Sequence, residues 1–321
     1  MFSAADVSVI IPSYNAETTI RACLTALTRQ TAAPREIIVV DSGQDGTQTI
    51  IQQHFPGVTL IALERQTFPG PARNLGAAQA SGAVLAFLDA DCLPGPHWVK
   101  QIAAWHSQGH AAAGGAVSVG NPQSSLAWAG HLMEFREFLP VGAPRAVEHI
   151  PSCNVSYRRD LFLNSGGFPD AYYPQEDLLF DFYLARRGTA IWFDPGIAVG
   201  HIYRDRLRSY LAHQHRIGRV TCCTLRRLPV REGIAARTRL GGALAAPLLG
   251  LVKAARTLAI FARRYPAIFL RRPAVTGYIL LGAAWWARGF QAGALRGLGN
   301  APGQALEDEA IFGKILAAGN G

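Results

Sequence analysis

The stretch AVLAFLDAD (residues 83–91) decides the fold. Its first part, Val84–Leu88, is an uncharged run with the length and composition of a strand buried on both faces. The run ends in Asp89 and Asp91, where packing does not require charge. Hard divalent cations such as Mg²⁺ or Mn²⁺ prefer carboxylate oxygens and bridge phosphates. The pair therefore predicts a metal site at a strand end, or alternatively a turn capped by Asp91 ahead of Pro94.

The chain before this stretch alternates between strand-like and helix-like segments. Val7–Ile11 is an apolar, β-branched run, and the segment Glu17–Gln30 that follows has apolar residues at helical spacing. Repetition of this order predicts a parallel sheet covered by helices on both faces. Ligands bind such sheets outside the carboxyl ends of the strands, so we expect the loops there to share one crevice. The further predicted strands are Glu36–Val40, Val58–Leu63 and Ala83–Leu88, the helices are Thr47–His54 and Pro71–Ala80, and the loops are Pro12–Asn15, Asp41–Asp45 and Asp89–Asp91.

A mixed α/β pattern continues to about residue 200, and the composition then becomes helical and rich in arginine. We expect an α/β domain over residues 1–220 and a helical extension over residues 221–321. The predicted elements of the mixed region are strands at Ala116–Val119, Val155–Tyr157 and Ala190–Phe193 and a helix at Glu176–Arg187.

Charge separates the two parts of the chain. Residues 1–200 hold 12 Lys and Arg against 17 Asp and Glu, whereas residues 201–321 hold 19 against 5. A basic, apolar tail predicts an anionic partner, which is either phospholipid or nucleic acid. Uncharged runs such as Leu240–Val252 and Pro273–Ala287 favour a membrane surface over nucleic acid, because a nucleic-acid arm would be polar throughout, and we expect no nucleic-acid partner.

Neither apolar segment of the tail is a clean membrane span, which would need about 20 apolar residues. We expect two helices that lie in the interface or insert shallowly, with Arg263-Arg264 and Arg271-Arg272 on headgroups. Tyr278 and Trp285-Trp286 would suit an interfacial belt. The alternative is that these helices pack on the α/β domain or on another copy.

Met1–Asp6 shows no secretory signal, so we expect the protein at the cytoplasmic face of the membrane, with its cysteines reduced.

Glu176-Asp177 is a second acidic pair, placed at the start of a predicted helix. Acidic residues in a first turn are favoured by the helix dipole, so capping is one interpretation. If the helix start faces a crevice, one of these carboxylates could instead act as a general base that removes a proton from an acceptor hydroxyl.

A third set of residues suits a nucleotide. It offers an aromatic ring to cover a base, an acid to accept from a base N–H or a ribose hydroxyl, and an arginine for phosphate. These residues are Pro12, Tyr14, Asp41 and Arg73. The loop after the first strand has no G-x-G-x-x-G sequence, which excludes a dinucleotide-dependent oxidoreductase.

The order of these segments resembles the glycosyltransferases of family 2, which have the GT-A fold. The resemblance covers about residues 6–205. It implies an inverting transfer by single displacement, in which a hydroxyl attacks the anomeric carbon opposite a leaving nucleotide diphosphate. The segments that carry it are Val7–Ala16, Ile37–Gly43, Asp89–Asp91 and Glu176-Asp177.

The resemblance also implies roles for individual residues. Asp91 would be a direct ligand of Mn²⁺ or Mg²⁺, and Asp89 would bind the metal or the ribose. His201 would complete the metal shell or touch the diphosphate, or alternatively cap a strand end. Asp177 would be the base and Glu176 its neighbour at the acceptor, with an exchange of these two roles left open.

On the nucleotide side, the resemblance implies that Pro12, Tyr14 and Asp41 hold the nucleoside and that Arg73 lies near the base or the diphosphate. Asn154 would belong to the acceptor-side segment of the site. Ser42 stands where the family often has a second Asp, so the nucleobase is left open.

The expected acceptor is a lipid-linked or surface glycan, inferred from the membrane location alone. Two other functions remain open. A sugar nucleotidyltransferase would need a glycine-rich loop after the first strand, which Pro12–Asn15 lacks. A non-catalytic membrane scaffold would have no need of Asp89, Asp91 and Asp177 together.

Overall fold

The computed structural model describes residues 1–170, 172–228 and 231–298, and these form two compact units. The α/β unit consists of Met1–Gly120 and Phe138–Ile202. The helical unit consists of Asn121–Glu137 and the described chain from Tyr203. The helical unit starts ahead of residue 221, because helix α8 (Leu207–Arg227) runs through this position without a break.

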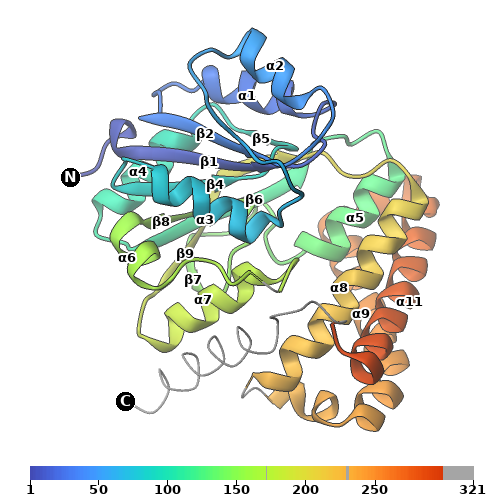
Figure 1. The fold of residues 1–321 in the computed structure, drawn as a ribbon. Helices are drawn as coiled ribbons and strands as arrows, with labels where there is room; N and C mark the ends of the chain where they lie inside the picture. Colours follow the sequence, from blue (N-terminus) through green and yellow to red (C-terminus); the bar gives the residue numbers. More distant parts are fainter. Residues whose placement is uncertain (171, 229–230, 299–321) are drawn as a thin grey trace. The chain divides into compact units, whose positions relative to one another are not determined.

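The described part of the α/β unit contains a nine-stranded sheet, drawn through the middle of this unit in Figure 1. The first four strands pair in parallel, as predicted, and their order in the sheet is β3-β2-β1-β4. Their bounds are β1 (Val7–Ser13), β2 (Glu36–Asp41), β3 (Thr59–Ala62) and β4 (Val84–Leu88). The 3-10 turn η1 (Ala4–Asp6) precedes them, and the helices between them are α1 (Ile20–Thr28), α2 (Thr47–His54) and α3 (Pro69–Gln79).

The second half of the sheet is mixed. Strand β8 pairs antiparallel with β4 and with β6, and β9 pairs in parallel with β6 and antiparallel with β5 and β7. The parallel arrangement is therefore confined to the first block of strands and the β6–β9 pair. The bounds are β5 (Cys92–Pro94), α4 (Trp98–Ser107), β6 (Ala112–Val119), β7 (Arg145–Val147), β8 (Asn154–Arg158), α6 (Arg159–Asn164), α7 (Glu176–Arg186) and β9 (Ile191–His201).

An aromatic cluster fixes α6 and α7 on the sheet. Phe87 of β4 lies 5.0 Å from Phe162 of α6 and 5.1 Å from Phe168 between ring centroids. Phe180 of α7 packs edge-on against Tyr157 of β8, with centroids 5.3 Å apart. Because burial of such rings is a large apolar contribution, this cluster holds the start of α7 in a fixed place beside the carboxyl end of β4.

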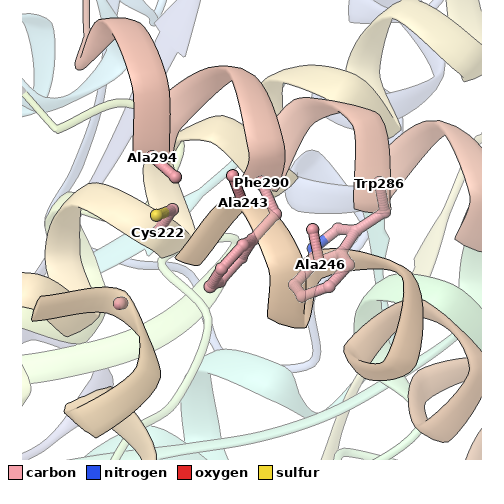
Figure 2. Close-up of a cluster of buried hydrophobic side chains, with 7 residues drawn as sticks. Cys222, Ala243, Ala246, Trp286, Phe290 and Ala294 are labelled. Carbon is pink, nitrogen blue, oxygen red and sulfur yellow. The ribbon is translucent and has the colours of Figure 1, made fainter. Parts of the chain in front are cut away.

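The helical unit consists of α5 (Ser125–Phe135), α8, η2 (Arg231–Arg237), α9 (Arg239–Arg264), α10 (Pro266–Arg271) and α11 (Pro273–Arg296). Helix α11 packs against both α8 and α9. Figure 2 shows the core between them, in which Trp286 and Phe290 of α11 meet small residues of the neighbouring helices. These small partners are Cys222, Ala243 and Ala246.

Trp286 does not have the interfacial position that the sequence suggested. Its side chain is buried in the core of the helical unit, and its ring lies under the ammonium group of Lys253, 5.4 Å from the ring centroid. The prediction of an interfacial belt is therefore wrong for Trp286. A tryptophan on a long apolar helix looks the same in sequence whether it faces lipid or a second helix.

Candidate active site

The loops after β1 and β2 lie against each other, as predicted. Ser13 and Asp41 are register partners at the ends of these strands, and Asn15 Oδ1 accepts a hydrogen bond of 3.0 Å from the backbone N–H of Gln44. A Cβ atom on Gly43 would stand 2.5 Å from the backbone nitrogen of Asn15. Glycine at position 43 is therefore required for the close approach of the two loops.

Asp41 presents an unused acceptor in this region. Its Oδ2 atom accepts from the backbone N–H of Gly43 at 3.3 Å and from Gln48 Nε2 at 3.0 Å. Its Oδ1 atom is buried and has no hydrogen-bond partner in the described part of the chain. A buried carboxylate oxygen without a donor is costly, so this atom suits a donor group of a ligand. Tyr14, which follows β1, is half exposed, whereas Pro12 is buried in β1.

A buried arginine joins the two acidic motifs. Arg73 Nη2 lies 2.5 Å from Asp89 Oδ1, and Arg73 Nη1 lies 2.9 Å from Glu176 Oε1. The side chains of Arg73 and Glu176 are both buried, so water screens their contact little, whereas the side chain of Asp89 is 31% exposed. Arg73 was predicted among the nucleotide ligands. In the structure its side chain links the end of β4 to the start of α7.

Two features of α3 place this guanidinium. A Cβ atom on Gly76 would stand 2.6 Å from Ile10 Cγ2, so glycine lets α3 approach β1 closely. The Asn74 amide donates to the carbonyl of Phe168 at 2.7 Å and accepts from its N–H at 2.9 Å. The close approach at Gly76 therefore fixes α3 on the sheet, and the hydrogen bonds of Asn74 fix it on the loop before α7.

Asp91 and His201 meet at the other side of the Asp-Ala-Asp motif. Strands β5 and β9 pair with Cys92 opposite His201, and the N–H of Ile202 donates to the carbonyl of Asp91 at 2.8 Å. This pairing brings Asp91 Oδ1 to 3.4 Å from His201 Nε2. The side chain of Asp91 is 38% exposed, whereas His201 is buried.

These two residues fit a divalent cation. Ligand atoms of Asp91, Cys92 and His201 lie within 4.8 Å of one another. The carboxylate oxygen suits Mn²⁺ or Mg²⁺, and the imidazole nitrogen, a ligand typical of transition metals, makes Mn²⁺ the better fit of the two. Burial raises the pKa of the Cys92 thiol, so this residue stays protonated and is a poor ligand. Sequence spacing gave no sign that Cys92 would belong to this group.

The two residues of the second acidic pair differ in their surroundings. Glu176 is almost fully buried, and burial followed by the charge of Asp177 raises its pKa. The side chain of Asp177 is 13% exposed and accepts from the backbone N–H groups of Ser152 at 2.8 Å and Leu178 at 2.7 Å. His149 Nε2 lies 3.5 Å from Asp177 Oδ1.

The partners of Asp177 decide its protonation. Burial alone would raise the pKa of its carboxyl group, but the adjacent imidazole of His149 and the hydrogen bond from the N–H of Ser152 outweigh burial and lower the pKa. The carboxylate is therefore held ionised and in one orientation. His149 and Ser152 were not identified from the sequence, because no spacing relates the loop before β8 to the start of α7.

Asn154 lies inside the sheet. Its amide donates to the carbonyls of Ala116 at 2.9 Å and Ile197 at 2.8 Å, and its Oδ1 atom accepts from Trp98 Nε1 at 2.7 Å. Its donors and its acceptor thus all have protein partners, and the residue is fully buried. The structure therefore gives Asn154 a role in joining β8, β6 and β9.

Comparison with known proteins gives a consistent picture. The model of glycosyl transferase family 2 matches residues 8–165. Glycosyltransferase AglE of Haloferax volcanii is 30% identical over 223 residues, which are 66% of this chain and 72% of that protein. The UDP-Glc:α-D-GlcNAc-diphosphoundecaprenol β-1,3-glucosyltransferase WfgD of Escherichia coli is 38% identical over 87 residues, which are 26% of this chain and 34% of that protein.

The fold also matches solved structures. The mannosyltransferase PcManGT from Pyrobaculum calidifontis, solved in complex with GDP-Man and Mn²⁺, superimposes with a TM-score of 0.51 at 19% identity. The match covers 98% of this chain and 85% of that protein. At this identity the likeness establishes the fold alone.

Proposed function

Because the chain belongs to glycosyltransferase family 2 and has the GT-A fold, we propose that it transfers a sugar from a nucleotide-diphosphate donor to a hydroxyl acceptor with inversion. The observation that carries the proposal is the Arg73 bridge. It ties Asp89, on the donor side, to Glu176, which precedes the proposed base. The two halves of a displacement reaction are thereby held in one rigid network.

The nucleoside would bind at the ends of β1 and β2. The unused Oδ1 atom of Asp41 would accept a hydrogen bond from a base N–H or a ribose hydroxyl. The half-exposed ring of Tyr14 would cover the base, and Pro12 would support the loop from within β1. This arrangement supports a nucleotide without fixing which base it carries.

The diphosphate and its metal would bind next to this site. Asp91 and His201 would hold Mn²⁺ or Mg²⁺, and Asp89 would contribute to the same region while Arg73 keeps its carboxylate fixed. A bound divalent cation would offset the negative charge that develops on the leaving diphosphate. Arg73 itself is buried and contacts Asp89 and Glu176, so its proposed role is positioning.

Asp177 would act as the base, and Glu176 as its anchor. Glu176 is fixed by Arg73 and closed to solvent, whereas Asp177 is the more exposed of the two. A carboxylate with a lowered pKa can still serve, because the attacking hydroxyl becomes strongly acidic as its bond to the sugar forms. The contacts with Ser152 and His149 would aim the carboxylate at the acceptor.

The acceptor is proposed to be a lipid-linked or surface glycan met at the cytoplasmic face of the membrane. The name of the relative WfgD includes a diphosphoundecaprenol-linked sugar, which supports this class of acceptor. The described part of the chain has one helix, α9, whose length and composition would allow a membrane crossing. All five cysteines are free, in keeping with a reducing compartment.

The proposal is tested with UDP-, GDP- and dTDP-linked sugars, each with Mn²⁺ and with undecaprenyl-diphosphate-linked N-acetylglucosamine as the acceptor. We expect release of nucleoside diphosphate from one donor only with metal, and a product whose anomeric configuration by NMR is opposite to that of the donor. Retention of configuration would rule out the inverting mechanism. A folded protein that binds no nucleotide would instead support the membrane scaffold.

A further inference from the structure

One face of α9 is apolar and exposed. Leucines recur along it every three or four residues, which places them on a single side of the helix. Their exposed fractions lie between 55% and 71%, far above those of core residues. The residues of this leucine face are Leu240, Leu244, Leu248, Leu251 and Val252.

The opposite face of α9 is already in use. Its small residues pack toward α11, and Figure 2 shows Ala243 and Ala246 beside Trp286 and Phe290. Rotation of the helix to hide the leucines would expose this core. A contiguous row of exposed leucines on a helix whose other side is packed marks a binding surface.

The charges around this face select the partner. Residues 239–296 contain nine Arg and Lys and no Asp or Glu. Arg237 and Arg239 are exposed at the start of α9, and Arg263 and Arg264 are exposed at its end. Arginine at both ends of an apolar helix face complements a layer of anionic headgroups along the whole length of the helix.

The packing of the helical unit opposes a membrane crossing by α9. Helix α11 contacts both α9 and α8, so the three helices form one packed body. Helix α8 carries five arginines, and its His213 lies 3.4 Å from Glu134 of α5. Lys253 of α9 donates to the carbonyl of Met133 at 3.0 Å. The packed helices carry too many charged groups to enter the hydrocarbon core of a bilayer together. The leucine face of α9 alone can enter it.

We infer that the leucine face of α9 lies flat on an anionic bilayer, with the leucines in the acyl boundary and the flanking arginines on headgroups. The inference rests on the proposed membrane location and specifies it. The helix would bind parallel to the surface, and the α/β unit would thereby be tethered where a lipid-linked acceptor is presented.

Vesicle flotation of the full chain tests the inference. Phosphatidylcholine vesicles with and without 30% phosphatidylglycerol are compared for the wild type and for the triple variant Leu244→Gln/Leu248→Gln/Leu251→Gln. The matched control changes three exposed leucines elsewhere, as Leu75→Gln/Leu163→Gln/Leu295→Gln. Circular dichroism and size-exclusion chromatography establish that each variant is folded.

We expect the wild type to bind only the anionic vesicles, the triple variant to bind at least about tenfold more weakly, and the control to bind like the wild type. Arg263→Gln/Arg264→Gln should weaken binding roughly tenfold or more and reduce its sensitivity to salt. Extraction with alkaline carbonate should release the wild type from membranes.

Three results would overturn the inference: equal binding of the triple variant and the wild type, resistance to carbonate, or a wild-type dimer that the triple variant converts to monomers. Binding of nucleoside diphosphate with Mn²⁺ is measured on the same samples. Vesicle binding without nucleotide binding would count against the proposed function alone, and the reverse result would count against the leucine face alone.

Discussion

Arg73 Nη1 lies 2.9 Å from Glu176 Oε1, although the two residues are 103 positions apart in the chain. The same guanidinium contacts Asp89, so one buried cation holds a carboxylate from each acidic motif. Buried charges persist only where such partners exist. The pairing therefore sets the position of the start of α7, and with it the position of Asp177.

Replacement of Arg73 by methionine should be strongly destabilising. The substitution would leave Asp89 and Glu176 without their shared cation, and loss of one partner of a buried pair typically costs about 3–5 kcal/mol. Urea unfolding of Arg73→Met against the wild type measures this cost. Arg35→Met serves as the control, because Arg35 makes a hydrogen bond near the surface.

A double-mutant cycle combines Arg73→Met with a second variant, Glu176→Gln. In the Arg73→Met background, it removes the charge that was left unpaired, so the double variant should be more stable than the sum of the single changes predicts. Strict additivity of the two free-energy changes would contradict the bridge.

Gly76→Ala should destabilise the protein by about 1–3 kcal/mol, because the added Cβ atom would collide with Ile10 Cγ2 and displace α3. Gly277→Ala is a matched control in α11, where the new Cβ atom would have no neighbour within 4 Å among the described residues. This control should be neutral or stabilising by up to about 1 kcal/mol. Thermal unfolding of both variants measures the difference, and equal effects would disprove the close approach of α3 to β1.

The periodic part of the fold was predictable. Alternation of apolar runs gave the parallel block β1 to β4, and α2 begins and ends at the residues expected from the sequence. The segment Ser125–Phe135 was missed, because α5 is buried nearly all round and shows no amphipathic pattern. Its membership of the helical unit depends on partners from Tyr203 onward, which local sequence does not show.

In the candidate site, the position of a residue was predictable where it lies at a strand end or a helix start. Asp91 and His201 follow this rule and come together. Arg73 and Asn154 do not, since their partners come from remote segments and their side chains are buried. His149 carries no spacing signal either, and only the folded chain brings it to Asp177.

Stability should fall between about pH 4 and pH 7 through Asp181. Burial raises the pKa of this carboxyl group to about 7, despite hydrogen bonds from Tyr157 Oη at 2.6 Å and the N–H of Ile150 at 2.8 Å. The unfolded chain loses the proton near pH 4, whereas the folded protein keeps it until about pH 7. The folded state thus binds one more proton in this window, and stability decreases as pH rises.

Asp181→Asn removes this proton. The slope of unfolding free energy against pH reports how many more protons one state binds than the other. From pH 5 to 7 the slopes of variant and wild type should therefore differ by the equivalent of about one bound proton, with the wild type losing more stability. Urea unfolding at pH 5, 6, 7 and 8 measures the slopes. Parallel curves for the two proteins would show that the carboxyl group is already ionised across this range.

Asp177→Asn should reduce turnover by about 10²–10⁴-fold, because the amide cannot accept the proton of the attacking hydroxyl. Binding of the donor with Mn²⁺ should be unchanged, since Asp177 lies outside the proposed donor site. Transfer rates and titration calorimetry separate the two effects. Asp160→Asn, a change at an exposed carboxylate, is the control and should leave both quantities unaltered. A loss of donor affinity equal to the loss of turnover would contradict the role of base.

Titration calorimetry of UDP, GDP, CDP and dTDP, each with and without Mn²⁺, measures whether Asp91 and His201 form a metal-dependent nucleotide site. We predict that one nucleotide binds, that binding requires the metal, and that Asp91→Asn abolishes it without loss of folding. Metal-independent binding, or equal binding by Asp91→Asn, would show that Asp91 and His201 do not form a metal-dependent nucleotide site.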